Sequence, residues 1–415
     1  MFDLSKSHTN DRRLAAAMLS AVTLAMSTAL PAASADPPAY TAQFITPGIS
    51  AINAAGINEA GDVVGTGTTG SGGWVSHAGA PAVLLPLPPG AQYSFANDIN
   101  DTGVIVGSVG PSSYPRLFGK AAAWIPDGSG GYTIQQFGTL PGHVSSDATA
   151  VNNVGDIIGY SSHGTFRYPV LFTAPGGIQD LSSTGVFDPV DINDQRVLID
   201  HSFTCKRLNL NTMIVEDLGV PAGPPNYLAS GGETINESGQ VAGSVILTSG
   251  GNCDHQSARY TDGVGWEVLS GCGQTNSAWD MNDHGDVVMR LNVAPHVRFE
   301  GIGTFLIEDL IVADAGHWYV INGYGLAINN SRQMAVPAAN NATNQSGIIL
   351  LTPNTGTGDI DGDGDVDLGD WAAFAACMSG PSVPFGSGCA SADLQLDNDG
   401  DLRDAALFQH DFTGP

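Results

Sequence analysis

A run of six aspartates near the C-terminus has the spacing of a metal-binding loop. The aspartates lie at positions 1, 3, 5, 7, 9 and 12 of the segment, with Gly364 at position 6 and Val366 at position 8. Carboxylate oxygens suit a hard cation, and the glycine permits the sharp turn that brings them together, so we predict an EF-hand-type calcium loop. An acidic disordered linker is the alternative, but such linkers have no fixed ligand spacing. The predicted ligands are Asp359, Asp361, Asp363, Asp365 (through its backbone carbonyl), Asp367 and Asp370.

A second, less regular copy begins 34 residues after the first. Asn398 replaces the glycine at position 6, where Asn tolerates left-handed backbone better than most residues. Arg403 adds a positive charge, so we expect this loop to bind calcium more weakly. Each loop is expected to lead into a short helix, because Phe374 and Phe408 each follow the last aspartate of a loop by four residues. The predicted ligands of the second loop are Asp393, Gln395, Asp397, Asp399, Asp401 and Asp404.

The two loop–helix units in tandem resemble a type I dockerin. They are more similar still to the dockerin-like tails of secreted planctomycete proteins, with the pattern GDxDGDGDVDLxD…C…ADL…FTGP. Gly358–Asp370, Cys389–Leu394 and Phe412–Pro415 carry this resemblance, which covers residues 358–415. Dockerins bind a cohesin domain through their duplicated helices. The resemblance therefore implies calcium-dependent docking to a cohesin-like or cell-surface protein.

The first 35 residues have the features of an export signal. Lys6, Arg12 and Arg13 form a basic start, residues 14–30 are apolar, and Ala33-Ser34-Ala35 supplies a cleavage site. The apolar stretch of 17 residues is short for a membrane span, and no later segment is long and apolar enough for one. We therefore predict a signal peptide over residues 1–35 and a protein that is secreted, periplasmic or attached to the cell surface.

The overall composition is acidic and indicates an all-β protein. The chain contains 54 Gly and 24 Pro, and only 13% of its residues are charged, whereas helical proteins usually carry more Glu, Lys and Arg. A net charge of −27 argues against nucleic acid and anionic membranes as partners, because both attract basic surfaces.

Disulfide bonds can persist in an exported protein, and the chain has five cysteines. Cys377 and Cys389 bracket the linker between the calcium loops and are predicted to pair. Cys253 and Cys272 flank a short candidate hairpin and form the other predicted bridge. Cys205 is left over and is expected to be a small buried apolar residue.

A phrase of the form Ile-Asn-x-x-Gly-x-Val-x-Gly recurs seven times with variations, and its asparagines are separated by 42, 52, 41, 43, 46 and 47 residues. The Asn side chain can start a turn. The Gly three positions later would take the left-handed backbone of a hairpin loop, after which the Val/Ile pair begins the return strand. The asparagines are Asn58, Asn100, Asn152, Asn193, Asn236, Asn282 and Asn329.

Two further strand candidates follow the hairpin in most repeats, and four short strands in about 45 residues match the size of a propeller blade. The last repeat stops after the strand at residues 347–351, while residues 40–45 form a strand that precedes the first repeat. The first strand would complete the last blade and leave no open edge. We therefore predict an all-β seven-bladed β-propeller over residues 36–357 and a small helical calcium domain over residues 358–415. An open β-solenoid or two β-sandwiches are the alternatives.

The repeats also resemble the extracellular repeats of the HAF family, whose elements look like A-x-x-I-N-x-x-G-x-V-V-G and L-G-T-L-x-G. Gly138–Gly142 matches the last element and Leu218–Gly223 echoes it, and the resemblance spans roughly residues 40–352. It implies an exported β-repeat protein without an established reaction.

No catalytic motif stands out. Gly65–Gly70 fits G-x-G-x-x-G, but no helix follows to bind a phosphate, so a glycine-rich turn explains it. The Asn-Asp and Gly-Asp pairs recur from repeat to repeat, which favours turn formation over catalysis. Our leading hypothesis is an exported, non-enzymatic binding or scaffold propeller with a calcium-dependent docking module. The alternatives are a secreted polysaccharide-degrading enzyme, such as a glycosidase or lyase, that carries a dockerin, and a cell-surface structural protein.

Overall fold

The structure is a computed structural model of the whole chain. It describes residues 39–46, 48–67, 72–111, 118–173, 176–222, 226–247, 255–271, 276–292, 294–311, 318–321, 325–353, 360, 366, 368–380, 389, 392, 394 and 400–411, except for the side chains of residues 51, 52, 403, 410 and 411. The predicted signal peptide, residues 1–35, lies outside the described residues.

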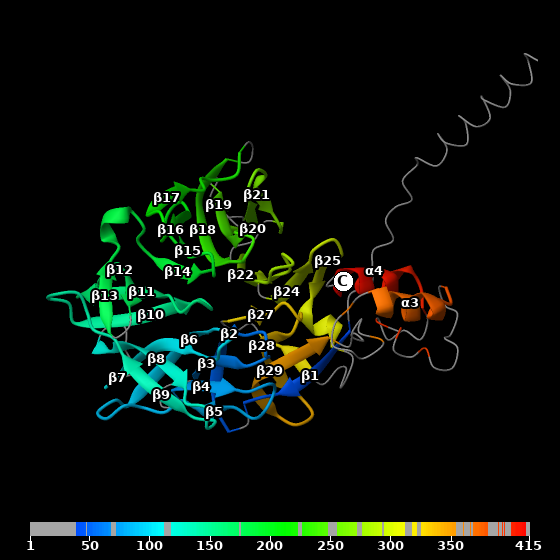
Figure 1. Cartoon of the computed structure of the whole chain (residues 1–415), viewed down its shortest axis with the longest axis horizontal. Helices are drawn as coiled ribbons and strands as arrows, with labels where there is room; N and C mark the ends of the chain where they lie inside the picture. Colours follow the sequence, from blue (N-terminus) through cyan, green and yellow to red (C-terminus); the bar gives the residue numbers. More distant parts are fainter. Residues whose placement is uncertain are drawn as a thin grey trace, which may run out of the picture. The chain divides into compact units, whose positions relative to one another are not determined.

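Seven antiparallel sheets follow one another along the chain, and six of them contain four strands in sequence order. Their innermost strands face the centre of a ring in Figure 1. The first three blades consist of β2 (Ala51–Ile57), β3 (Val63–Gly67), β4 (Gly73–Ser76) and β5 (Val83–Leu84); β6 (Tyr93–Ile99), β7 (Ile105–Gly110), β8 (Lys120–Pro126) and β9 (Tyr132–Gln136); and β10 (Ser145–Val151), β11 (Ile157–His163), β12 (Phe166–Thr173) and β13 (Gly177–Asp180). The next three consist of β14 (Pro189–Ile192), β15 (Val197–Asp200), β16 (Lys206–Asn209) and β17 (Ile214–Asp217); β18 (Tyr227–Ile235), β19 (Val241–Leu247), β20 (His255–Thr261) and β21 (Gly265–Val268); and β22 (Ser277–Met281), β23 (Val287–Leu291), β24 (Ala294–Phe299) and β25 (Gly303–Leu306). The prediction of a seven-bladed β-propeller is confirmed.

The seventh blade joins the two ends of the repeat array. Its inner strands are β26 (Trp318–Val320) and β27 (Ala327–Ile328), followed by β28 (Met334–Asn340) and β29 (Gln345–Pro353). The N-terminal strand β1 (Tyr40–Phe44) pairs antiparallel with β29 as the outermost strand. The predicted exchange of the first strand into the last blade is therefore confirmed.

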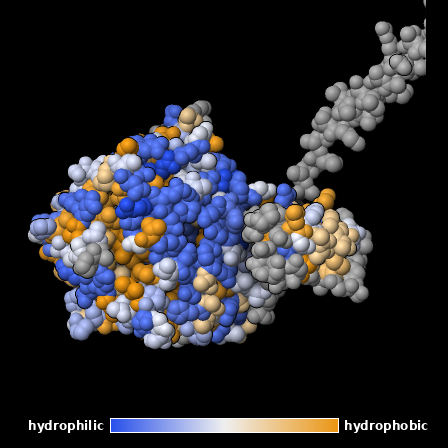
Figure 2. Space-filling model, in the orientation of Figure 1, coloured by the Kyte–Doolittle hydropathy of each residue, from blue (hydrophilic) through white to orange (hydrophobic). Residues whose placement is uncertain are grey.

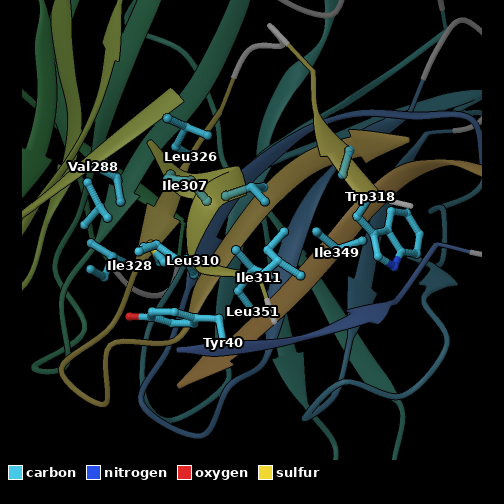
Figure 3. Close-up of a cluster of buried hydrophobic side chains, with 14 of the residues drawn as sticks. Tyr40, Val288, Ile307, Leu310, Ile311, Trp318, Leu326, Ile328, Ile349 and Leu351 are labelled. Carbon is cyan, nitrogen blue, oxygen red and sulfur yellow. The ribbon is translucent and has the colours of Figure 1, made fainter. Parts of the chain in front are cut away.

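Tyr40 anchors this closing strand. Its ring is fully buried in the apolar cluster that also contains Ile311 and Leu351 (Figure 3). Its hydroxyl donates a hydrogen bond of 3.1 Å to the backbone carbonyl of Arg332. The residue thus contributes apolar burial and satisfies its polar atom at the same time.

The repeated motif forms the turn between the first two strands of each blade, here called the axial turn. In the first blade the N–H of Gly61 donates to the carbonyl of Asn58, and the N–H of Asn58 donates to the carbonyl of Asp62. Gly61 has a φ of 78°, as the predicted left-handed position requires. Arg196 and Arg332 replace this glycine in two repeats and keep the same conformation, with φ of 64° and 57°.

The apolar core lies between neighbouring blades. Val64 and Val75 of the first blade, for example, pack in one cluster with Ile99, Ile105 and Trp124 of the second. The second and third strands have neighbours on both faces, so they contain runs of buried residues, whereas the outermost strands are largely exposed.

The C-terminal segment contains two short helices, α3 (Leu368–Cys377) and α4 (Leu402–Asp411). Phe374 and Phe408 are buried and their ring centroids are 5.3 Å apart. The predicted disulfide bond between Cys377 and Cys389 is present. Cys205 is a free, buried cysteine, as predicted, whereas Cys253 and Cys272 lie outside the described residues. No helix among the described residues is long and apolar enough to span a membrane.

Candidate functional site

Three of the predicted calcium ligands lie within the described part of the chain: Asp370, Asp401 and Asp404. The others lie outside the described residues: Asp359, Asp361, Asp363, Asp365, Asp367, Asp393, Gln395, Asp397 and Asp399. The two loops can therefore be compared only where each meets its helix.

The last aspartate of each loop occupies the same place in its helix. Asp370 is the third residue of α3, Asp404 is the third residue of α4, and both are fully buried. Asp404 accepts a hydrogen bond of 3.0 Å from the N–H of Asp401, and Asp370 accepts one from the N–H of Ile360. A carboxylate in the first turn caps free N–H groups and complements the helix dipole.

These two carboxylates fit a calcium-binding role. A buried carboxylate is unfavourable unless hydrogen bonds or a cation compensate its charge, and oxygen donors are what calcium prefers. Ile360 and Val366, from the first loop, pack against the cluster that contains Phe374 and Phe408. The apolar residue at position 8 of the predicted loop is expected to pack the loop against its neighbour, and the contact of Val366 agrees with this.

A closed ring of asparagines surrounds the propeller axis. In every blade the side-chain amide of the motif Asn donates a hydrogen bond of 2.9–3.2 Å to the backbone carbonyl of the motif Asn in the next blade. Its side-chain oxygen accepts the backbone N–H four residues later, within its own turn. We call this the Asn ring: Asn58, Asn100, Asn152, Asn193, Asn236, Asn282 and Asn329.

The residues that follow the Asn ring form a second closed ring. The backbone N–H of each donates 2.6–3.0 Å to a side-chain oxygen of its counterpart in the next blade. Five members are carboxylates and two are amides, and burial raises the pKa of Glu59 and Glu237. We call this set the acidic collar: Glu59, Asp101, Asn153, Asp194, Glu237, Asp283 and Asn330.

Three further aspartates project into the centre from alternate blades. Asp98, Asp191 and Asp280 each lie two residues before a motif Asn, in the second, fourth and sixth blades. Each accepts the N–H of its own following residue and an N–H of the next blade; Asp98, for example, binds Ile99 and Val151 at 2.8 Å each. Each carboxylate therefore joins a pair of neighbouring blades.

Burial raises the pKa of these three aspartates. Protein surrounds the carboxylates although their residues keep some accessible surface, and the pKa of Asp280 rises to about 7. The pKa of Asp98 lies well above its ordinary value, mainly through burial and next through the charge of Asp191. The pKa of Asp191 is also raised by burial. Desolvation disfavours the charged form, so this centre binds protons more readily than free aspartate does.

The members of the acidic collar other than Asp194, together with the three aspartates, line one axial cavity of about 270 Å³. Carboxylates in a narrow, protein-walled cavity attract cationic groups and repel anionic ones. Among the described residues, no three His, Cys, Asp or Glu side chains are close enough together to hold a metal ion. The cavity is therefore an acidic, hydrogen-bonded centre, and most of its acceptors already serve to join the blades.

The sequence contained a signal for this centre that the motif analysis missed. The Asn-Asp pairs are predicted to form turns, and the structure confirms this. However, the position after the motif Asn is acidic in five repeats, and the position two before it is Asp in every second repeat. Residues that recur at the same place in each blade come together around the axis of a closed ring.

Comparisons with known proteins bear on the fold alone. No protein-family model matches this chain, and no curated protein matches it. Similar solved structures include virginiamycin B lyase from Staphylococcus aureus (12% identity, TM-score 0.47, 75% of this chain and 99% of that one). They also include the extracellular domain of a putative hybrid two-component system from B. thetaiotaomicron (9% identity, TM-score 0.47, 80% of this chain and 43% of that one). YCF48 bound to a D1 peptide is another (12% identity, TM-score 0.42, 77% of this chain and 96% of that one). Such distant likenesses carry no argument, and this chain covers less than half of the extracellular domain of the two-component system.

Proposed function

We propose that this protein is an exported, non-enzymatic β-propeller that binds a partner and carries a calcium-dependent docking module at its C-terminus. The proposal of a docking module rests on the equivalent positions of Asp370 and Asp404. Both carboxylates are fully buried at the third position of a helix. Two buried carboxylates at the same position of two loop–helix units suit a duplicated cation site better than a solvated linker.

Calcium would supply the positive charge that this acidic segment lacks. The first ion would be held by Asp359, Asp361, Asp363, Asp365, Asp367 and Asp370. The second would be held by Asp393, Gln395, Asp397, Asp399, Asp401 and Asp404. Because metal binding and folding are coupled in small domains, bound calcium would order the loops and fix the two helices for a partner.

The helices carry apolar side chains that a partner protein could cover. Leu368 is 63% exposed, Trp371 is 41% exposed and Leu402 is 77% exposed. Large apolar residues exposed on a small domain mark interaction surfaces. A cohesin-like or cell-surface protein is the partner that we propose for this face.

The binding role of the propeller is supported by how its repeated residues are used. The Asn ring and the acidic collar join every blade to the next, which holds the blades as a closed frame. The residues that recur in each blade therefore hold the ring of blades closed. The loops on such a rigid propeller are free to vary in sequence and to bind a partner.

Calorimetric titration of the chain lacking residues 1–35 with calcium tests the docking module. We expect saturable binding, and we expect Asp370→Asn and Asp404→Asn each to weaken one site by about tenfold or more. Asp127→Asn, an exposed turn residue of the propeller, is the control and should change nothing. Absence of calcium binding by the unaltered chain, or equal binding by the Asp370→Asn/Asp404→Asn double variant, would refute the calcium module.

A further inference from the structure

A second cavity lies at the end of the propeller opposite the axial turns. Strand β14 runs from Pro189 to the turn at Asn193, and Pro189 pairs with Asp200, so the loop 201–205 lies at this opposite end. The cavity has a volume of about 610 Å³ and is lined by this loop, by β18 and β19, and by residues that begin β20 and β22. It therefore draws on three consecutive blades.

Apolar side chains form part of the wall of this cavity. Phe203 is 65% exposed and Leu228 is 50% exposed. The carbonyl of Phe203 accepts a hydrogen bond of 3.1 Å from the N–H of Ser230, which holds the loop against β18. An aromatic ring is thus presented to solvent from an anchored backbone.

Polar groups line the rest of the cavity. His201 pairs with Glu233 at 2.9 Å between Nδ1 and Oε1, and the hydrogen bond to Glu233 raises the pKa of His201 to about 9. Glu233 also lines the axial cavity, so the two cavities share this residue. Hydroxyl and amide groups are contributed by Ser202, Ser230, Ser244, Asn276 and Ser277.

Exposed phenylalanines continue from this cavity across the neighbouring blades. Phe118, in the loop before β8, and Phe166, the first residue of β12, occupy equivalent places in blades 2 and 3, and they are 62% and 69% exposed. Phe187 lies in the loop that enters blade 4 and is 62% exposed. We call Phe118, Phe166, Phe187 and Phe203 the phenylalanine row; the space-filling view shows how exposed apolar residues alternate with hydrophilic ones on one face of the molecule (Figure 2).

Hydrogen bonds and ion pairs link the members of the phenylalanine row into one surface. Arg167, next to Phe166, lies 3.7 Å from Asp188, next to Phe187. The N–H of His201 donates 2.9 Å to the carbonyl of Asp188, which connects this part to the loop that carries Phe203. The surface is therefore continuous from blade 3 to the cavity.

A cation is close to each of the first three phenylalanines, to two of them in the sequence and to Phe187 in space. Lys120 follows Phe118 by two residues, Arg167 follows Phe166 directly, and Lys206 lies 5.1 Å from the Phe187 ring. The lysines donate to the carbonyls of Val144 and Gly185. Among the described residues, neither lysine ammonium group forms an ion pair within 4.0 Å, but the buried carboxylate of Asp200 accepts the backbone N–H of Lys206 at 2.8 Å.

The cations at the other end of the propeller differ, since each is neutralised by a carboxylate. Arg196, Arg207, Arg259 and Arg332 all form ion pairs of 2.6–2.8 Å, with Asp156, Asp262, Glu300 and Asp286. On the phenylalanine row the carboxylates are Asp188, which pairs with Arg167, Glu233, which pairs with His201, Asp217, which accepts from Thr204, and Asp200, which accepts the N–H groups of Phe187 and Lys206. In a chain of net charge −27, lysine ammonium groups that form no ion pair, one of them over the Phe187 ring, favour an anionic partner.

We propose that the cavity at Phe203 binds one sugar unit of an acidic, uronate-bearing polysaccharide, and that the chain continues over the phenylalanine row. Flat rings pack against sugar rings, the hydroxyl and amide groups suit sugar hydroxyls, and the lysines suit carboxylates. Rings in consecutive blades match a ligand with a repeating unit. An acidic peptide would satisfy the lysines but would gain less from a cavity lined by hydroxyl groups.

The inference rests on the proposed binding role of the propeller and is independent of the calcium module. It is tested with the chain lacking residues 1–35, by affinity electrophoresis and calorimetry against pectate, alginate and hyaluronate. Neutral galactan and dextran, and polyglutamate, serve as comparison ligands. We expect binding to at least one uronate polymer, weakening with added salt, and no comparable binding to the neutral polymers or to polyglutamate.

Variants locate the site. Phe203→Ala and the Lys120→Gln/Lys206→Gln double variant should each weaken uronate binding by about tenfold or more, whereas Phe203→Tyr keeps the ring and should retain it. Val154→Ala, an exposed apolar residue of an axial turn, is the matched control. Thermal unfolding and calcium titration of each variant should match those of the unaltered chain.

Four results would overturn the inference: no binding to any uronate polymer, equal binding to polyglutamate, equal binding by Phe203→Ala, or loss of binding with a calcium chelator. The last result would move the polysaccharide site to the C-terminal module. If Phe203→Ala still binds calcium but no longer binds the polysaccharide, the two sites are independent. This result would separate the inference from the proposed calcium module.

Discussion

Asn329 and Asn58, 271 residues apart in the sequence, are joined by a hydrogen bond of 3.0 Å from the side-chain amide of Asn329 to the backbone carbonyl of Asn58. This bond closes the Asn ring between the last blade and the first. On the outer side the same junction is closed by β1, which pairs with β29. The propeller is therefore fastened twice at the point where its chain ends meet, near the axis by side chains and at the rim by a strand.

Removing one member of the Asn ring should destabilise the whole propeller. Asn152 is almost fully buried; its amide binds the carbonyl of Asn193 at 2.9 Å and its oxygen accepts the N–H of Asp156 at 2.7 Å. Asn152→Ala leaves the N–H of Asp156 without its partner and removes one of the two hydrogen bonds that the carbonyl of Asn193 accepts, the other coming from the N–H of Arg196. We therefore expect the free energy of unfolding to fall by about 2–4 kcal/mol. Denaturant unfolding measures this change, with exposed Asn341→Ala as the control. A loss equal to that of the control would show that the ring does not contribute to closure.

The three central aspartates should make stability depend on pH. The pKa of Asp280 rises from 3.8 to about 7 on folding. As the pH rises, the unfolded state therefore loses this proton at a lower pH than the folded state does. Where the folded state binds more protons, stability falls as pH rises, here between about pH 4 and pH 7. Asp280→Asn removes this titration.

We therefore expect the free energy of unfolding of Asp280→Asn to change less with pH over this window than that of the unaltered chain. Unfolding is measured in the presence of a calcium chelator, so that metal binding adds no pH dependence of its own. Exposed Asp309→Asn should keep the original slope. Parallel pH profiles for the unaltered chain and Asp280→Asn would contradict the assignment.

The blades could be predicted from the sequence because each blade is formed by residues that are close together in the sequence. A turn such as Asn58 to Gly61 and its flanking strands depend on residues within one repeat, and the seven asparagines therefore predicted seven sheets. The outermost position of β1 was also predictable, because an incomplete last repeat and an extra first strand complement each other.

The axial centre was not predicted because its contacts join different repeats. The partner of the Asn152 side chain is 41 residues away, and that of Asp98 is 53 residues away. Their proximity follows only once the ring is closed and its innermost strands converge. Arg196 replaces the glycine of the repeated phrase, yet it keeps the left-handed turn and binds Asp156 of the preceding blade at 2.7 Å.

Gly155, in the axial turn of the third blade, should resist substitution for backbone reasons alone. Gly155 has a φ of 90° and no atom within 4 Å of an added Cβ, so Gly155→Ala isolates the cost of the left-handed backbone. We expect a loss of about 1–2 kcal/mol in the free energy of unfolding. Gly138→Ala is the matched control, because that site is equally open but has no positive φ. It should leave stability unchanged or raise it by about 0.4–1 kcal/mol. Equal effects at the two sites would contradict the backbone explanation.

Reduction of the disulfide bond should loosen the C-terminal module without affecting the propeller. Cys377 and Cys389 close a short loop, with a sequence separation of 12, between α3 and the residues that pack against Phe374 and Phe408. Removing such a crosslink costs about 2–4 kcal/mol, a large share of the stability of a small domain. We expect the Cys377→Ser/Cys389→Ser variant to be cleaved faster by protease within residues 358–415, while the propeller fragment survives. Cys205→Ser is the control for thiol loss, since Cys205 is buried within the propeller. Faster cleavage of the propeller, or no change in the C-terminal module, would show that this disulfide does not hold the module together.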